Sequence, residues 1–465
     1  MKRLRDGKSE VMEMVSQISS TDQTKQWLLK QLEDIGDKEQ VHLSDGSETI
    51  ELIYFKSLCD PNFVSENLVN RYYEIQNTEQ YCDYVRSYPS SKVAKDGEDA
   101  LDNVLKGQVV VFTKEHIYLF DALWVEGADV SPASTENVIQ GPTDSFTESI
   151  DTNMNLIRRR YQTAHLKSEY MNLGKTSKTR IAILYDDRRV DQNVLKELRH
   201  RLSLIDEDVV QSASEIERFT MKPNLRLFPT IMLSERPDRT VLNISQGKIA
   251  VVMDTTGYVL LLPAIFNDFF TAMDDQIQLP PIGWFLKVIR YIGLFLTILL
   301  PALYVAFTSY NPEILKMQIT LLIAGSRATV PYPSFFEVLF MLLAMEFLME
   351  ASVRLPKSIG PTATTVGGLI LGTAATEAGL VSNIMVILVA AVAITNFVIP
   401  LTMMSFGIRV AKYIFILLST FFGLVGIVLG MIGMIMYLTS LRSFGKPYFK
   451  MFAIDKSAKE GQNNG

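Results

Sequence analysis

The sequence predicts a soluble α/β N-terminal region of two related subdomains, followed by an α-helical polytopic membrane domain. Three observations support this fold class. Most charged residues of the 465-residue chain precede residue 280, most long apolar segments follow it, and one order of strands and helices occurs twice in the charged part. We therefore expect α/β subdomains over residues 1–140, with a flexible N-terminal segment, and 141–279, a transmembrane domain over 280–440 and a cytoplasmic tail over 441–465.

The repeated pattern is an apolar strand that ends in an acidic turn, then a helix, then a β-hairpin. In the first copy these elements are expected at Thr49–Phe55, Asn62–Glu74 and Gly107–Ala122. In the second copy they are expected at Arg180–Tyr185, Asp191–Leu204 and Gly247–Ala264. Because the same order of elements recurs, we predict that the two halves share a fold.

Composition argues against several classes of function. The net charge of −6 does not suit a nucleic-acid partner, which would require a basic face. Two isolated cysteines, Cys59 and Cys82, are typical of a reducing compartment, and the four histidines are scattered. The N-terminal residues lack the apolar core of a secretory signal, which places this region in the cytoplasm. With no phosphate loop, dinucleotide fingerprint or zinc motif, we expect no catalytic residues, metal or cofactor, and no enzyme.

The apolar segments predict about four membrane spans, near residues 284–307, 362–381, 383–404 and 411–438. Residues 334–351 are also apolar but contain Glu337, Glu346 and Glu350, and three carboxylates in one span would be costly. We interpret this segment as an amphipathic or re-entrant helix, with a full span as the alternative. The basic residues after Leu441 favour cytoplasmic N- and C-termini, although a five-span topology stays open.

Two basic clusters are candidates for a subdomain or subunit interface. The first is Arg158, Arg159 and Arg160, at the end of an expected helix. A salt-bridged helix end is the favoured interpretation, and contact with anionic lipid or a partner is the alternative. The second contains Glu235, Arg236 and Arg239, which form either a structural ion-pair knot or an interface.

Small residues line two apolar segments. Gly368 and Gly372 are one helical turn apart, and Gly423, Gly426, Gly430 and Gly433 follow at spacings of 3, 4 and 3. Because small side chains let helices approach closely in lipid, we predict that these glycines serve helix packing. Lining of a narrow path is the alternative.

Five stretches of the chain resemble the A subunit of bacterial spore germination receptors, the GerA family. They are Gly141–Arg160, Glu235–Arg239, Pro280–Phe285, Pro333–Gly360 and Gly372–Ser382. The resemblance implies a nutrient-responsive receptor complex in the inner membrane of the spore, with a transporter-like B subunit and a lipoprotein C subunit. It also implies self-association and a contribution to a monovalent-cation path. A secondary membrane transporter is the alternative function.

The candidate residues for this ion path or for coupling are polar groups in or near the apolar segments. They are Glu337, Glu346, Glu350, Glu377, Thr373 and Asn396. Glu377 is either a cation or proton site or a carboxylate that reaches the membrane interface, because an unpaired buried charge is expensive in lipid.

Overall fold

The structure is a computed structural model, and it describes residues 21–44, 49–75, 77–124, 131–136, 138, 140–220, 226–356 and 359–449. The chain divides into two compact units. The α/β unit contains residues 1–137, 142–222 and 231–263, and the helical unit contains residues 138–141, 223–230 and 264–465. Residues 1–20, where the sequence predicts a flexible segment, lie outside the described part, and residues 21–31 form a helix.

The first subdomain of the α/β unit is built on a five-stranded antiparallel sheet in the order β1-β2-β4-β5-β3. Its strands are β1 (Lys38–Ser44), β2 (Thr49–Phe55), β3 (Ser91–Val93), β4 (Gln108–Phe112) and β5 (Ile117–Asp121). Its helical segments are α2 (Pro61–Val64), the π-helix η1 (Ser65–Asn70), α3 (Arg71–Ile75), α4 (Thr78–Ser87) and α5 (Gly97–Leu105). The predicted strand, helix and hairpin of the first copy are therefore confirmed.

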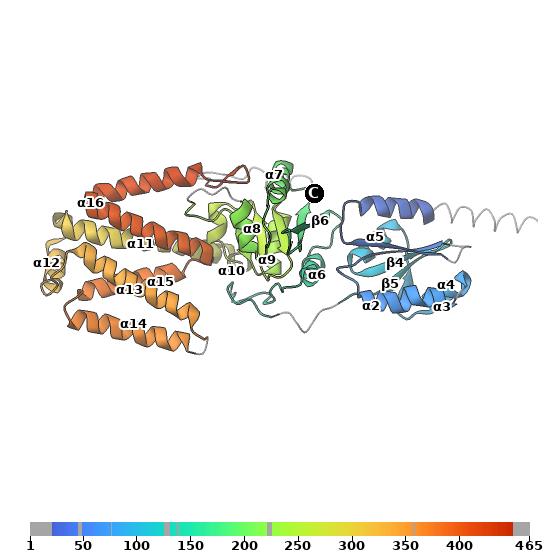
Figure 1. The fold of residues 1–465 in the computed structure, drawn as a ribbon, viewed down its shortest axis with the longest axis horizontal. Helices are drawn as coiled ribbons and strands as arrows, with labels where there is room; N and C mark the ends of the chain where they lie inside the picture. The colour runs from blue at the N-terminus through green and yellow to red at the C-terminus, as the bar shows by residue number, and fades with distance from the viewer. Residues whose placement is uncertain are drawn as a thin grey trace, which may run out of the picture. The chain divides into compact units, whose positions relative to one another are not determined.

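Helices cover both faces of this sheet (Figure 1). The helix over residues 21–31 and α5 bury Leu28 and Val104 against one face, which includes Phe55. The segments α2 to α4 bury Leu68 and Tyr81 against the other. The alternation of side chains along each strand produces these two separate cores.

The second subdomain repeats the topology of the first. Its antiparallel sheet has the order β6-β7-β9-β10-β8, which matches the first sheet strand for strand. The strands are β6 (Leu166–Leu173), β7 (Thr179–Asp186), β8 (Met232–Ser234), β9 (Ile249–Met253) and β10 (Val259–Leu262). The helices are α6 (Ile150–Arg160), α7 (Gln192–Ser203), α8 (Ala213–Thr220) and α9 (Pro237–Ser245). The prediction of two related α/β subdomains is confirmed by this shared strand order.

Polar residues fix where the helices of both subdomains begin. Five helices begin at an N-cap whose side chain accepts hydrogen bonds from backbone N–H groups of the first turn. These N-caps are Asp60, Asn77, Asp96, Ser149 and Asp191. These bonds satisfy donors that the helix itself leaves without partners. The acidic turns seen in the sequence thus act as helix starts.

The helical unit begins with two short segments and continues through longer helices. In order these are η2 (Phe266–Phe270), α10 (Asp274–Ile277), α11 (Pro280–Ser309), η3 (Pro312–Ile314), α12 (Met317–Ser326), α13 (Ser334–Arg354), α14 (Gly360–Glu377), α15 (Asn383–Phe397) and α16 (Thr402–Ser440). In the described part, α11 and α16 are long and apolar enough to cross a membrane, with mean hydropathies of 2.0 and 2.5. This composition fits a membrane location.

The helix α16 is broken in its middle by Gly423. There the backbone adopts φ 58° and ψ −137°, a conformation that essentially only glycine tolerates. A Cβ on Gly426 would lie 2.2 Å from the carbonyl oxygen of Leu418, and one on Gly430 would lie 3.0 Å from the ring of Phe415. The residues 424–440 therefore run back alongside residues 402–422 as a helical hairpin (Figure 1). The predicted span near residues 411–438 therefore consists of two helical segments separated at Gly423.

Residues 441–449 do not extend as a free tail. They form a small antiparallel pair, β11 (Arg442–Ser443) and β12 (Lys446–Pro447), within the helical unit. Ser443 Oγ donates to the carbonyl of Thr230 at 2.6 Å, and the fully buried Tyr448 packs against Phe266 and Phe269. The first part of the expected tail is thus a packed element, and residues 450–465 lie outside the described residues.

Candidate functional site

A buried ion pair joins the two subdomains of the α/β unit. The guanidinium of Arg158, at the end of α6, donates to both carboxylate oxygens of Asp37, and the two side chains are 2% and 3% exposed. Ser168 Oγ donates to Asp37 Oδ1 at 2.9 Å, and the guanidinium lies 4.5 Å from the centre of the Phe55 ring. Burial by itself would raise the pKa of Asp37, but the charge and hydrogen bonds of Arg158 hold that pKa below its ordinary value.

The other two arginines of the cluster are arranged differently. Arg159 is exposed, and Arg160 pairs with Asp144 at 2.5 Å near the surface. Arg158 therefore lies at a subdomain interface, whereas Arg160 forms the salt-bridged helix end that the sequence favoured. An adjacent polar residue, Asn155, was not predicted, and its amide donates to the carbonyls of Ser57 and Trp124 at 2.8 and 3.1 Å.

The segment around Glu235 holds the connection between the subdomains. Glu235 Oε1 accepts from the backbone N–H groups of Thr135 and Glu136, and Arg239 Nη1 donates to Glu136 Oε2 at 2.9 Å. The buried Arg236 donates to the carbonyls of Glu136 and Pro142 at 3.1 and 2.9 Å. These contacts lie within one chain, so this cluster forms a structural knot of the α/β unit. The sequence analysis did not identify the partner of this cluster, Glu136, which lies about 100 residues away along the chain.

Two of the carboxylates predicted on α13 are paired inside the helical unit. Glu337 is fully buried, and it accepts from the backbone N–H of Ser382 at 2.7 Å and lies 3.2 Å from Arg327 Nε. Because Ser382 caps the N-terminus of α15, the Glu337 charge also faces the positive end of that helix dipole. Glu346 accepts from Arg409 Nε at 2.8 Å and from Lys412 Nζ at 3.1 Å, both on α16.

The remaining candidates lie elsewhere. Glu350 is exposed and pairs with Arg354 one turn away, and the buried Asn396 accepts a hydrogen bond from Ser405 at 3.0 Å. Thr373 and Glu377 are exposed on α14. The six candidate ion-path residues are therefore not brought together into one cluster within the single chain. Among the described residues, no group of three or more His, Cys, Asp or Glu side chains could hold a metal ion.

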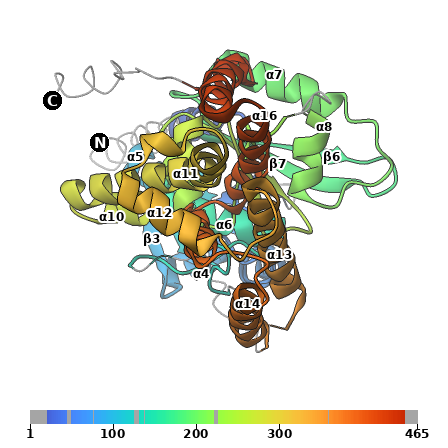
Figure 2. The same ribbon diagram turned by 90° about the vertical axis from the view of Figure 1, so that its left-hand side faces the viewer.

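The helix α14 presents a polar face on the outside of the helical unit. At 100° per residue, its members lie within an arc of about 120°. They are Thr362, Thr365, Thr373, Thr376 and Glu377, and the exposed apolar residues Val366 and Leu369 lie within the same arc. The buried residues among those described on this helix are Gly360 and Ala375, on the opposite side. Figures 1 and 2 show α14 at one edge of the helical unit, next to α13 and away from α11.

Two hydroxyl groups of this polar face, which we call the α14 polar face, are oriented by their own helix. Thr373 Oγ1 donates to the carbonyl of Leu369 at 2.9 Å, and Thr376 Oγ1 donates to that of Gly372 at 3.1 Å. Since the hydroxyl hydrogens are used in these bonds, the oxygen lone pairs remain to accept from water or to coordinate a cation. Glu377 ends the helix, where the negative end of the dipole adds to the attraction for cations.

The predicted glycines differ in what they contact. A Cβ on Gly368 or Gly372 would make ordinary contacts, with Leu348 of α13 and Val386 of α15, at 3.9 and 3.7 Å. Gly426 and Gly430 permit the close approach of the two halves of α16, and Gly423 forms the reversal. A Cβ on Gly433 would meet nothing within 4 Å, so this residue borders open space.

Two matched antiparallel sheets are joined in one chain to a unit with two helices apolar enough for a bilayer, an arrangement that fits a two-part protein at a membrane. The chain belongs to the GerA family of Bacillus/Clostridium spore germination proteins, whose model matches residues 24–461. It is 34% identical to spore germination protein KA of Bacillus subtilis, over 90% of this chain and 77% of that protein. It is 32% identical to spore germination protein GerLA of Bacillus cereus, over 88% of this chain and 85% of that protein.

The chain is also similar to a solved structure. It is the crystal structure of the N-terminal domain of the A subunit of the Bacillus megaterium spore germinant receptor GerK3. The sequence identity is 22%, the TM-score is 0.39, and the match covers 52% of this chain and 93% of that domain.

Proposed function

We propose that this chain is the A subunit of a nutrient-responsive germination receptor, and that several copies together form part of a monovalent-cation path in the inner spore membrane. The family membership supports the receptor role. The α14 polar face is the single observation that carries the ion path, because it places hydroxyl oxygens and a carboxylate on the outside of one chain. Polar groups facing lipid would be costly, so copies that turn these faces toward a shared axis relieve that cost.

The paired carboxylates of α13 are less suited to binding a cation. Around Glu346, one carboxylate meets two cations, Arg409 and Lys412, and the local formal charge of +1 opposes an incoming cation. Glu337 is fully buried and neutralised by Arg327. In contrast, no described cation forms an ion pair with Glu377. We therefore assign the cation-attracting role to Glu377.

The same pairing changes the proposed topology. The carboxylates that argued against a membrane span at residues 334–351 are neutralised at Glu337 and Glu346, so α13 is suited to cross the bilayer. We place α11, α13, α14, α15 and both halves of α16 in the membrane. Six crossings leave both chain ends on one side, which agrees with the cytoplasmic termini predicted from the basic C-terminal residues. Partnership with a transporter-like B subunit and a lipoprotein C subunit completes the proposal.

Cross-linking tests the shared axis. In the full chain, co-expressed with its receptor partners in membranes and with Cys59 and Cys82 replaced by serine, a Thr373→Cys variant should form disulfide-linked copies on mild oxidation. Val425→Cys is a matched control, because Val425 is 64% exposed but lies on α16. Cross-linking of Val425→Cys without cross-linking of Thr373→Cys would contradict the arrangement, since it would put α16 rather than α14 between copies.

A further inference from the structure

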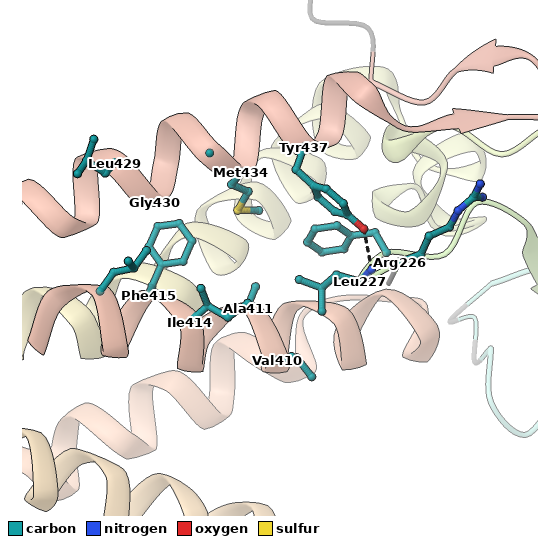
Figure 3. Close-up of a pocket in the computed structure, with 13 residues that line it drawn as sticks. Arg226, Leu227, Val410, Ala411, Ile414, Phe415, Leu429, Gly430, Met434 and Tyr437 are labelled. Atoms are coloured by element: carbon teal, nitrogen blue, oxygen red, sulfur yellow. Dashed lines mark hydrogen bonds between the residues drawn. The ribbon is translucent and has the colours of Figure 1, made fainter. Parts of the chain in front are cut away.

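An apolar cavity of about 530 Å³ lies between the two halves of α16 (Figure 3). Ala411, Ile414 and Phe415 border it on one half, and Leu429 and Met434 border it on the other. The short segment formed by residues 226–228 lies at its end. The volume is within the range of about 300–1,000 Å³ that is typical of ligand sites.

Glycines create this cavity and a hydrogen bond holds its end in place. Gly430 keeps the halves close near Phe415, while Gly433, one turn further on, borders open space. The backbone N–H of Leu227 donates to Tyr437 Oη at 2.7 Å, so the segment 226–228 is fixed against the second half of the hairpin (Figure 3). The cavity is therefore a built part of the helical unit.

The chemistry of the lining selects the occupant. The lining side chains on both halves are apolar or aromatic, and they belong to a helix with a mean hydropathy of 2.5. Arg226 lies at the end of the cavity, where the hairpin ends, and its guanidinium points away from the cavity and donates from Nη1 to Thr230 Oγ1 at 3.3 Å. The exposed Arg442 follows α16 at the same end of the hairpin and adds a second positive charge there.

We propose that this cavity binds one acyl chain of an anionic phospholipid, with the phosphate at Arg226. An acyl chain matches the apolar walls, and a basic residue at the membrane surface attracts an anionic headgroup. The distance along the helix from Gly430 to Tyr437 is about 10 Å. An acyl chain that enters the cavity at Tyr437, where the hairpin ends, can therefore extend into the hydrocarbon layer. The site requires α16 to lie in the membrane but does not depend on the proposed ion path.

Native mass spectrometry of the full chain, released from nanodiscs with equal amounts of phosphatidylglycerol and phosphatidylcholine, tests this site. The wild type should retain one phosphatidylglycerol. Gly433→Leu should lower that retention at least tenfold by filling the cavity. Gly325→Leu is the matched control and should retain lipid like the wild type, because a Cβ there also meets nothing within 4 Å and the residue lies on α12.

Arg226→Gln separates the charge from the apolar walls. It should keep lipid binding but lower the preference for phosphatidylglycerol about fivefold, the effect expected from one basic residue. Equal retention in the wild type and the Gly433→Leu variant would overturn the site. Equal retention of the two lipids by the wild type would overturn the assignment of an anionic headgroup. Size-exclusion chromatography of each variant checks that the fold is kept.

Discussion

Glu346 on α13 is ion-paired with Arg409 on α16, with the Arg409 Nε atom 2.8 Å from the Glu346 Oε2 atom. Lys412, whose side chain is only 3% exposed, approaches the same carboxylate at 3.1 Å. The three charges tie two helices that are far apart in the sequence. They also mean that each cation depends on one shared carboxylate for its neutralisation.

Removing that carboxylate should destabilise the helical unit. Glu346→Gln leaves two cations without their partner, and because Glu346 is only partly buried we expect a cost of about 3 kcal/mol, the lower end of the range for breaking a buried pair. Glu350→Gln on the same helix is the control, because its pair with Arg354 is exposed and is worth less than about 1 kcal/mol. Thermal unfolding of the purified full chain in detergent should show a lower midpoint temperature for Glu346→Gln but not for Glu350→Gln. Equal midpoints would show that the Glu346 pair adds no stability.

A second prediction concerns the interface of the two subdomains. Arg158→Met leaves the buried Asp37 carboxylate unpaired, and we expect a loss of about 3–5 kcal/mol. Arg159→Met, one residue further on, changes an exposed side chain and should have little effect. Hydrogen exchange of the full chain should show faster exchange around β6 in the Arg158 variant alone. Unchanged exchange would mean that the ion pair does not hold the subdomains together.

Glu217 on α8 predicts a pH dependence of stability. Burial raises the pKa of this carboxyl from 4.5 to about 7, although a hydrogen bond from the backbone of Ile231 opposes the rise. The folded chain therefore binds more protons than the unfolded chain between these values, and stability falls as pH increases through that window. Glu217→Gln should remove this decline and stabilise the chain by up to about 3 kcal/mol at pH 8. Chemical denaturation of the wild type and the variant at pH 5 and pH 8 measures their free energies of unfolding. If both proteins lost the same stability between pH 5 and pH 8, Glu217 would not be the cause of the decline.

The reversal of α16 depends on Gly423. Alanine there would be forced into a left-handed backbone region, and its Cβ would lie 3.0 Å from the Tyr310 ring. We expect Gly423→Ala to cost about 1–3 kcal/mol. Gly433→Ala is the control and should be neutral or slightly stabilising, because it removes a helix glycine next to open space. The melting temperature of Gly423→Ala should therefore fall clearly below that of Gly433→Ala. Equal melting temperatures in the two variants would contradict a reversal of the chain at Gly423.

The sequence predicted the repeated α/β fold well because its signals are local. Acidic caps, apolar strands and hairpin turns mark β2, β7 and the two hairpins directly. The edge strands β1 and β6 were missed, since Lys38–Ser44 and Leu166–Leu173 mix polar and apolar residues and become strands by pairing with a neighbour.

The helical unit was harder to predict for physical reasons. The glycine spacing in α16 predicted close helix packing, but it did not reveal that Gly426 and Gly430 face the same helix, turned back at Gly423. The partners of Glu346 and Arg158 lie 63 and 121 residues away, so no local spacing identifies them. The exposure of Thr373 and Glu377 likewise depends on how α14 packs within the unit.

Cation release from spores tests the central claim most directly. Spores whose receptor carries Glu377→Gln should release monovalent cations several-fold more slowly after the nutrient is added, with the receptor assembled at normal levels, because the carboxylate that attracts the cation is gone. Glu313→Gln, an exposed carboxylate of the same unit that lies outside the α14 polar face, should release cations at the wild-type rate. Unchanged release in the Glu377 variant would contradict a cation path along the α14 polar face.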